Sequence, residues 1–232
     1  MKKNILYILL GIFLLASCQQ ENEIPSGTGY LYVEGIELQL QVVTEVVSRA
    51  VDESLTVDLY KGGQLVRTLT PEEMQNKIEL EPATDYMLKV HSANYGSESA
   101  WNNETKGEPV YYKEVPFEVT EGATTALKVQ VPMITFAVCL NLTDVMGDWL
   151  KNYTFSVTSG NRIVTLQGGE TAYFSYSEGA SFSYQLSVTN SDDETNVQPQ
   201  PGSWGIDKGK VEMNTLYTVT YNWATQALVV TE

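Results

Sequence analysis

Apolar and polar residues alternate with a period of two along most of this chain from Gly29 onward. The alternation is strict over residues 36–42 (IELQLQV) and returns over residues 55–60 (LTVDLY). A period of two predicts β-strands that bury one face. Similar short runs predict further strands over residues 65–69, 78–80, 86–90, 115–119, 125–131, 134–142, 153–157, 162–166, 181–189, 217–223 and 227–230.

Turn residues separate these predicted strands. Gly62 and Gly63 stand between two alternating runs and predict a hairpin. Short strands joined by turns are typical of β-sandwiches. We therefore expect an all-β fold of two consecutive β-sandwich domains, immunoglobulin-like or transthyretin-like, over residues 29–131 and 132–232. The two halves share a plan of opening strand, hairpin, middle strand, irregular loop and closing pair. Only residues 144–150 have a pattern that could form a short helix.

The first 17 residues have the pattern of an export signal. Lys2 and Lys3 precede an apolar stretch, residues 5–15, that is too short to span a bilayer. The stretch ends in Leu-Ala-Ser-Cys, which resembles the lipobox of bacterial lipoproteins, where the cysteine is acylated and begins the mature chain. We expect residues 1–17 to be a lipoprotein signal peptide and Cys18 to hold the protein on the outer membrane by its lipid. The alternative is an ordinary signal peptide followed by a chance cysteine.

A polar segment follows the predicted lipid attachment site. Residues 18–28 are rich in Gln, Glu, Gly and Pro and predict a flexible tether. Residues 19–23 (QQENE) loosely resemble the acidic signal that directs lipoproteins of Bacteroidetes to the outer leaflet. We therefore expect the anchored protein to face the cell exterior.

The chain is acidic, with a formal net charge of −15. Because proteins that bind nucleic acid neutralise its phosphates with Lys and Arg, this charge argues against nucleic acid as a partner. Cysteine usage adds a second constraint. Once Cys18 is lipidated, Cys139 has no second cysteine with which to pair. We expect no disulfide, and we expect Cys139 to act as a small buried apolar residue.

The sequence lacks the residue patterns of a catalytic or metal site. His91 is the only histidine, and its position in an alternating strand, opposite Val90, places it toward solvent. No His pair or Cys-x-x-Cys motif is present for zinc. Residues 190–194 (NSDDE) are acidic enough to bind calcium, but they lack the spacing of a calcium loop and also fit an ordinary turn. We expect a protein with no enzymatic activity, no metal and no cofactor.

Aromatic residues are the most suggestive side chains in the predicted loops. Tyr95 and Trp101 lie in a polar loop of the first half, Tyr112 follows that loop, and Trp204 lies in a long loop of the second half. Exposed rings beside Asn and Glu can stack on sugars and hydrogen-bond their hydroxyls, so these four residues are candidate glycan contacts. The alternative, which we favour, is that the rings pack over the open ends of the sandwiches.

Several segments together resemble a family of Bacteroidetes lipoproteins of unknown function. They are the opening Gly-Tyr-Leu at 29–31, Ser-Arg-Ala at 48–50, the strand at 55–60, the aromatic segment at 110–122, and the runs at 172–174 and 184–188. The family's architecture is similar to that of fimbrillins, lipoprotein precursors of two transthyretin-like sandwiches. Fimbrillins assemble when an N-terminal strand is cut away at an arginine and a strand of the next subunit replaces it.

The resemblance gives Arg49 a candidate role as a proteolytic processing site, and the alternative is a plain loop arginine. It also implies other surface or fimbrial subunits as partners, bound by strand addition. Two features argue against a stalk subunit. The sequence ends directly after the strand at 227–230, which leaves no spare donor segment, and a cut at Arg49 would separate the domains from the lipid.

These patterns together predict a non-enzymatic cell-surface lipoprotein with an adhesion or fimbria-related role, as an anchor or accessory protein. The alternative is a carbohydrate-binding surface lipoprotein of a glycan-uptake system, whose partners would be host or dietary glycans. An enzyme is the third option, and it lacks a supporting motif.

Overall fold

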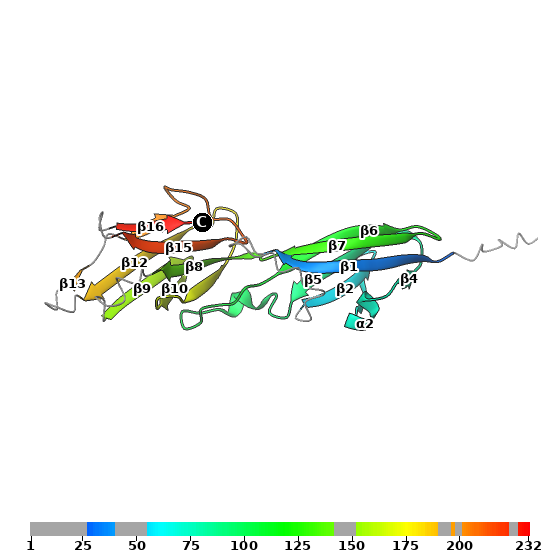
Figure 1. The fold of residues 1–232 in the computed structure, drawn as a ribbon, viewed down its shortest axis with the longest axis horizontal. Helices are drawn as coiled ribbons and strands as arrows, with labels where there is room; N and C mark the ends of the chain where they lie inside the picture. The colour runs from blue at the N-terminus through cyan, green and yellow to red at the C-terminus, as the bar shows by residue number, and fades with distance from the viewer. Residues whose placement is uncertain (1–26, 40–54, 142–151, 190–195, 198–200, 223–226) are drawn as a thin grey trace, which may run out of the picture.

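The computed structural model describes residues 27–39, 55–141, 152–189, 196–197, 201–222 and 227–232. Over these residues the chain forms two β-lobes placed end to end, the first built from β1 to β7 and the second from β8 to β16 (Figure 1). None of the described helices is long and apolar enough to cross a membrane. The predicted signal peptide, Cys18, Arg49, the 144–150 helix and the acidic residues 190–194 lie outside the described residues.

The first lobe contains two sheets. One has the strand order β4-β1-β7 and the other has the order β3-β2-β5-β6. β1 pairs in parallel with β7 and antiparallel with β4. The elements are β1 (Gly29–Gln39), β2 (Leu55–Lys61), β3 (Gln64–Thr68), α2 (Pro71–Met74), β4 (Ile78–Leu80), β5 (Ala83–Ser92), the 3₁₀ helix η1 (Ser97–Ala100), β6 (Tyr112–Val119) and β7 (Thr124–Pro132).

The second lobe also contains two sheets. One has the strand order β11-β8-β15-β16, and the other has the order β10-β9-β12-β13 with β14 also paired to β12. β8 pairs in parallel with β15. The strands are β8 (Thr135–Asn141), β9 (Asn152–Ser159), β10 (Arg162–Leu166), β11 (Thr171–Ser175), β12 (Phe182–Thr189), β13 (Asn196–Val197), β14 (Gly202–Trp204), β15 (Leu216–Asn222) and β16 (Ala227–Thr231).

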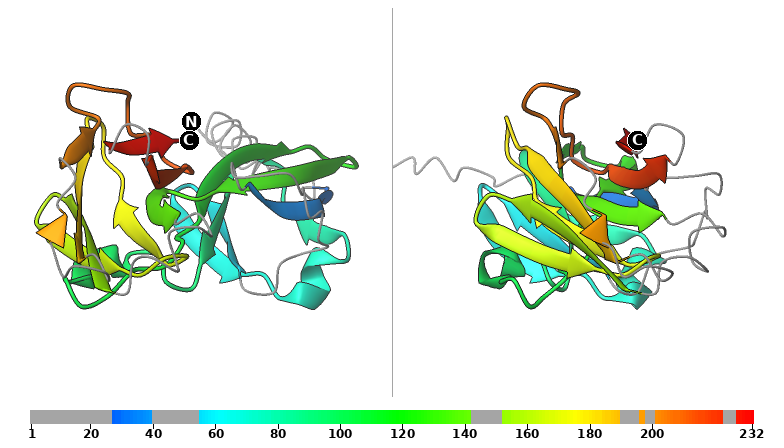
Figure 2. Two further views of the ribbon diagram at one scale, coloured as in Figure 1. Left: turned by 60° about the vertical axis from the view of Figure 1, so that its left-hand side comes forward. Right: turned by 90° about the vertical axis from the view of Figure 1, so that its left-hand side faces the viewer.

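The two lobes repeat one topology. In each lobe the opening strand, β1 or β8, lies between a short antiparallel strand and a parallel strand that comes late in the lobe. The following hairpin, β2–β3 or β9–β10, forms one side of the opposite sheet. The layers of both lobes are visible in Figure 2. The second lobe differs in its last strand, β16, which extends the sheet beyond β15.

Each lobe encloses its own apolar core. The first core includes Leu31, Leu59 and Leu88, and the second includes Phe136 and Tyr217. Along β1 and β2 the buried residues alternate with more exposed ones, as a sheet that buries one face requires, whereas Thr135–Val138 of β8 are buried on both faces. The predicted all-β fold of β-sandwich type is thus confirmed. The boundary between residues 131 and 132 stays a prediction, and the described β7 and β8 are separated only by Met133 and Ile134.

A bulge changes the phase of the alternation within β1. Leu31 and Val33 point into the core, and the pairing with β7 then skips a position before Gly35. An extra residue reverses the direction of the side chains that follow it, so Ile36 also points inward. The strand therefore runs from Gly29 to Gln39 with a change of phase in its middle, and the strict alternation of the sequence covers only its second half.

The expectation that only residues 144–150 could form a helix was wrong, because Pro71–Met74 forms the short helix α2. Thr70 caps it: the Thr70 hydroxyl accepts the Glu73 backbone N–H, and the Glu73 carboxylate accepts the Thr70 backbone N–H. Met74 buries its side chain in the first core. The sequence Thr-Pro-Glu-Glu carries the signal for this capping box, with proline at the first helical position.

Candidate functional site

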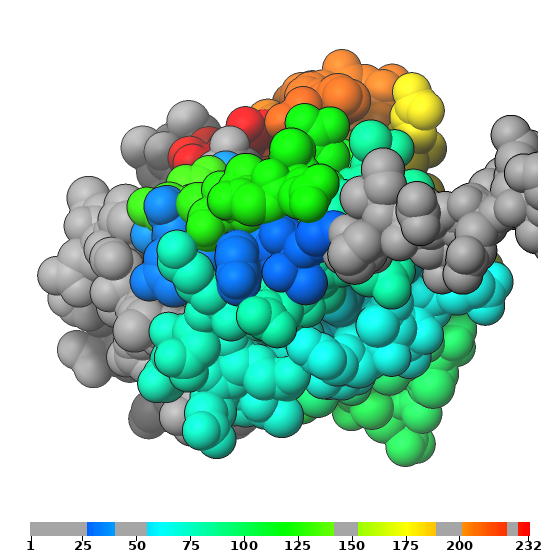
Figure 3. Space-filling view, turned by 90° about the vertical axis from the view of Figure 1, so that its right-hand side faces the viewer, coloured from blue at the N-terminus to red at the C-terminus, as the bar shows by residue number. Residues whose placement is uncertain are grey.

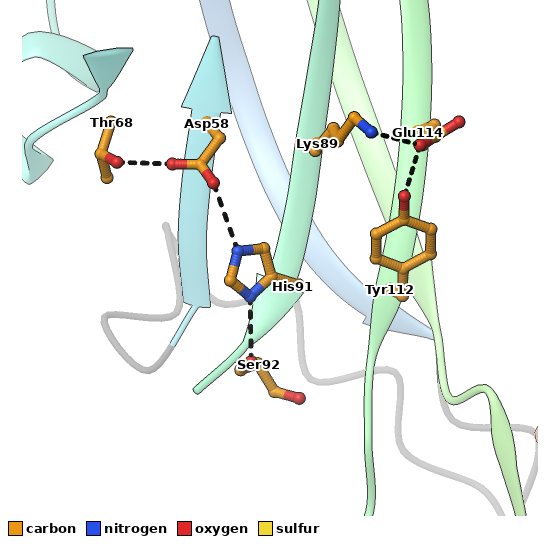
Figure 4. A network of polar contacts seen from close by, with 7 residues as sticks. All are labelled: Asp58, Thr68, Lys89, His91, Ser92, Tyr112 and Glu114. Carbon is orange, nitrogen blue, oxygen red and sulfur yellow. Dashed lines mark hydrogen bonds and ion pairs between the residues drawn. The ribbon is translucent and has the colours of Figure 1, made fainter. Parts of the chain in front are cut away.

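The sheet β3-β2-β5-β6 presents a regular polar and aromatic face to solvent. Because Leu55, Val57 and Leu59 of β2 point into the core, the residues between them point outward. The register of β2, β5 and β6 aligns these outward residues into rows across the sheet. We define the outer face as Thr56, Asp58, Tyr60, Met87, Lys89, His91, Tyr112 and Glu114, together with Tyr95, which stacks on Tyr112. Figure 4 shows five of these residues, Asp58, Lys89, His91, Tyr112 and Glu114, with their polar contacts.

His91 lies on this face between two hydrogen-bond acceptors. Its Nδ1 is 3.1 Å from the backbone oxygen of Ser92, and its Nε2 is 3.4 Å from Oδ2 of Asp58. Asp58 also accepts a hydrogen bond from the Thr68 hydroxyl. Both partners are hydrogen-bond acceptors, so a ring nitrogen of His91 that carries a hydrogen can donate it to the one it faces. The side chain of His91 is 23% exposed, so it is less open to solvent than the sequence indicated.

Glu114 joins two neighbouring strands in a second polar network. It accepts hydrogen bonds from the Tyr112 hydroxyl and from Lys89 Nζ, the latter at 2.9 Å. The hydrogen bond from the Tyr112 hydroxyl and then that from Lys89 lower the pKa of Glu114. Burial and the bond to Glu114 raise the pKa of the Tyr112 phenol. Lys89 also lies 4.7 Å above the centre of the Tyr60 ring, so its charge is shared between a carboxylate and an aromatic face.

The structure brings two of the four candidate glycan contacts together. Tyr95 stacks on Tyr112 with 4.4 Å between ring centroids and 4° between ring planes. Tyr95 keeps 43% of its surface exposed, and His91 lies 5.5 Å away on the same side of the sheet. An exposed flat ring beside hydroxyl, carboxylate and imidazole groups can offer both stacking and hydrogen bonds to a ligand.

The other two candidates lie in separate surroundings. Trp101 is partly buried, and the guanidinium of Arg162 lies 5.2 Å above its ring. Trp204 is partly buried on β14 and packs on Tyr217 at 6.1 Å. Both rings pack against neighbouring side chains, which is the role that we favoured over glycan contact from the sequence. Their role as glycan contacts stays a prediction.

The described part of the chain contains few residues suited to metal binding or nucleophilic catalysis. Among those residues, no group of three or more His, Cys, Asp or Glu side chains lies close enough to hold a metal ion. Cys139 is only partly buried, with Sγ 3.6 Å from the Thr218 hydroxyl, so it is more open than the sequence indicated. Cys139 and His91 stand in different lobes.

Sequence reasoning missed the polar partners on the outer face. Asp58, Lys89 and Glu114 lie on three different strands, and the register of those strands makes them neighbours. The alternation within each strand indicated that they face solvent. It contained no signal for which of them would align.

We expect acid to destabilise the protein in part through Glu114. Its pKa is lowered from 4.5 in the folded state, so its stabilising effect is present above the unfolded pKa. That effect is lost as pH falls through the folded pKa. Glu114→Gln should lower the free energy of unfolding at pH 7 by up to about 1 kcal/mol, the range of surface ion pairs, and should flatten its decline below pH 5. Urea denaturation between pH 3 and 7 measures both effects. Glu118→Gln, on the same strand, is the matched control, and equal pH profiles for the two variants would contradict the prediction.

Comparison with known proteins places the chain in a family. The model of a domain of unknown function, DUF4493, matches residues 27–231. The chain belongs to this family. The predicted membership of a family of unknown function is therefore confirmed. A search of curated proteins found no match to this DUF4493 chain.

Solved structures similar to this DUF4493 chain include proteins from Bacteroides and Porphyromonas. A fimbrilin from Porphyromonas gingivalis is 9% identical, with 88% of this chain and 94% of that chain covered and a TM-score of 0.44. A candidate adhesin from Bacteroides thetaiotaomicron is 10% identical, with 90% and 97% covered and a TM-score of 0.42. A candidate polysaccharide-binding protein from the same species is 10% identical, with 87% and 95% covered and a TM-score of 0.42.

Proposed function

We propose that this DUF4493 chain is a non-enzymatic lipoprotein, displayed on the outer membrane, with an adhesion or fimbria-related role. The observation that carries the proposal is the position of β1. It is the first described strand of the chain, yet it lies in the centre of its sheet, between β4 and β7. Arg49, the candidate cleavage site, lies in the sequence between β1 and β2. A cut there would leave β1 held by noncovalent contacts alone.

The contacts of β1 define what a replacement strand must supply. Leu31, Val33 and Ile36 are almost fully buried in the first core. Burying such a side chain stabilises a protein by about 1.5–3 kcal/mol, so an empty groove would be strongly unfavourable. A replacement strand needs apolar residues at these three positions and must run parallel to β7. In the end-on view of Figure 3, β1 (blue) reaches the surface between the green strands β6 and β7 and the cyan part of the first lobe.

The second lobe has no opening strand that a cut at Arg49 would detach. β8 is the counterpart of β1, but it continues from β7 through two residues and is followed by the rest of its lobe. We therefore propose that strand replacement is confined to the first lobe. In the uncut protein, a lipid on Cys18 would leave the second lobe outermost, because β1 begins at the end of the molecule away from that lobe (Figure 1). Replacement of β1 after a cut at Arg49 would release both lobes from this lipid.

Peptide exchange tests the replacement of β1. The purified mature chain is cut with an arginine-specific protease, and a fluorescent peptide of residues 29–39 is added. We expect the peptide to co-elute with the cut chain in size-exclusion chromatography but not with the intact chain. Arg49→Lys should block both the cut and the uptake, and a peptide with Leu31→Asp and Ile36→Asp should not bind. Cleavage at Arg49 without uptake would mean that β1 is permanent, and the fimbria-related role would be wrong.

Surface display has a separate test. Protease added to intact cells should digest the protein, and Cys18→Ser should release it from the membrane fraction. Protection from protease until the cells are lysed would place the protein in the periplasm and contradict an adhesive role. A retained membrane association of Cys18→Ser would contradict the lipid anchor.

A second candidate function is carbohydrate binding on the outer face. The stacked and exposed Tyr95 is the observation that favours it, because sugars bind to flat aromatic rings next to hydrogen-bonding groups. A glycan array should detect binding that Tyr95→Ala abolishes, while circular dichroism shows an unchanged fold. Tyr176→Ala, in the second lobe and outside the set of candidate glycan contacts, is the control for loss of an aromatic elsewhere. An array without any binding would rule against this function.

A further inference from the structure

A long segment of the first lobe lies against the second lobe. Residues 93–110, here called the strap, connect β5 to β6 and extend along the second lobe beside β10 (Figure 1). Such an excursion costs conformational entropy, so it is ordered only if contacts hold it. The contacts that hold the strap centre on Arg162, the first residue of β10.

Arg162 donates from all three guanidinium nitrogens, two of them to the strap and one to β11. Nε donates to the backbone oxygen of Asn102 at 3.2 Å, and Nη2 donates to that of Thr105 at 2.7 Å. Nη1 donates to the backbone oxygen of Tyr173 in β11 at 2.7 Å. The same cation lies 5.2 Å from the centre of the Trp101 ring and 4.9 Å from that of Phe174. Arg162 thus connects an aromatic ring of each lobe as well as their backbones.

Three neighbouring contacts fasten the strap on both sides of Arg162. The backbone N–H of Ile163 donates to Asn103 Oδ1 at 2.9 Å, and that of Tyr173 donates to the backbone oxygen of Lys106 at 2.7 Å. Lys106 also forms an ion pair with Glu170. The strap therefore covers the end of β10 and part of β11, where unpaired backbone groups would otherwise face solvent.

A second attachment lies where the chain passes between the lobes. Asn214, in the loop before β15, accepts the backbone N–H of Met133 at 3.2 Å through its side chain. Its own N–H donates to the backbone oxygen of Thr135 at 2.9 Å. The backbone N–H of Ile134 donates to the oxygen of Val110, at the end of the strap, at 2.7 Å. Two attachments at different points oppose rotation of one lobe relative to the other.

The groups that bind Arg162 determine how these contacts respond to pH and to salt. All three acceptors are backbone carbonyls, which do not titrate, and an arginine keeps its charge at any physiological pH. The two aromatic rings cover part of the cation, which is only partly buried, and the carbonyl acceptors carry no net charge for salt to screen. Titratable groups of the strap and its surroundings are Tyr95, Glu98, Glu104, Lys106, Glu108, Glu170 and Tyr173. Of these, Glu170 forms an ion pair with Lys106, and the hydrogen bond from Lys106 lowers the pKa of the Glu170 carboxyl. This ion pair is lost when the pH falls below that lowered pKa, because Glu170 is then protonated.

We propose that the strap is a lock between the lobes, that Arg162 is the residue on which the lock depends, and that it holds in acid and at high salt. The two lobes then move as one body, and a force on the outer lobe reaches the first lobe through the strap as well as through Met133 and Ile134. This inference does not depend on the partner or on strand exchange.

The distance between two spin labels, one in each lobe, tests the lock. Gln64→Cys and Gln185→Cys supply exposed label positions in a Cys139→Ser form of the mature chain without Cys18. We expect one narrow distance distribution in the parent and a distribution at least twice as wide in Arg162→Ala. Arg67→Ala, which removes an arginine from the first lobe, should leave the distribution narrow. An unchanged distribution in Arg162→Ala would overturn the proposal.

Four further measurements keep the test decisive. If Arg162→Ala fails to fold, Asn103→Ala loosens the strap without emptying the arginine site, and it should widen the distribution to a smaller extent. The parent should keep its narrow distribution at pH 4 and in 1 M salt, as should Lys106→Ala at pH 7. If the distance distribution of the parent widens at pH 4, ion pairs hold the lobes together and the proposed lock is wrong. If Asn103→Ala leaves the distribution unchanged, the junction at Met133 and Ile134 holds the lobes together, and the lock is again wrong.

Discussion

Replacing Phe136 with alanine lowers the free energy of unfolding by about 3–5 kcal/mol. Phe136 is fully buried in the second core, and its ring contacts those of Phe174, Phe182 and Tyr217 at centroid distances of 5.4, 5.9 and 6.2 Å. Removing it takes away apolar burial and leaves a cavity among three rings that cannot easily close around it. Chemical denaturation of the mature chain measures the loss.

A loss of this size is a large fraction of the stability of a typical domain. Phe136→Leu, which keeps most of the volume, should cost less than half as much. Phe117→Ala makes the same change in the first core, where Phe117 stacks on Tyr86 at 5.3 Å, and should destabilise the first lobe instead. Hydrogen exchange assigns each loss to a lobe. A loss below about 1 kcal/mol for Phe136→Ala would mean that the second core is looser than the structure indicates.

Replacing Asn214 with alanine lowers the free energy of unfolding by about 2–4 kcal/mol, because two costs add. The first is the lost acceptor: the N–H of Met133 is buried and would have no side-chain partner. The second is backbone strain. Asn214 has φ of 60°, the left-handed region that asparagine tolerates better than alanine. Thermal and chemical denaturation measure the sum.

Two further substitutions separate these costs. Asn214→Gly removes the acceptor but accepts the left-handed backbone, so it should be more stable than Asn214→Ala by about 1 kcal/mol. Asn214→Asp retains an acceptor and should recover part of the hydrogen bond. If glycine and alanine are equally destabilising, strain at this position is negligible. If neither destabilises the protein, the junction between the lobes does not depend on Asn214.

Much of the local structure was predictable because it depends on neighbours in sequence. Alternation identified the strands on both sides of Gly62 and Gly63, and these glycines have φ of 57° and 77°, values that other residues rarely adopt. The helix at Pro71–Met74 was also encoded locally, in its capping box. It was missed because a four-residue helix has no period to detect.

The outer face was predictable only in part. Alternation along β5 indicated that His91 and Lys89 point away from the core. Their partners, Asp58 and Glu114, come from other strands, and a shift of one residue in register would have turned those side chains inward. The stack of Tyr95 on Tyr112 likewise depends on where a loop folds back, which no short-range pattern specifies.

The sequence by itself determined that this protein is built of short strands that bury one face, because the spacing of apolar residues sets which side of a strand can leave water. It also indicated the lipid anchor. Only the tertiary structure decided that β1 lies in parallel beside β7, and that Arg162 reaches across to the strap. These contacts join residues about 60 to 100 positions apart. Closing such long loops costs conformational entropy, and only the contacts of the complete fold offset that cost. Every residue has a backbone carbonyl group, so the sequence does not indicate which of these carbonyls bind Arg162.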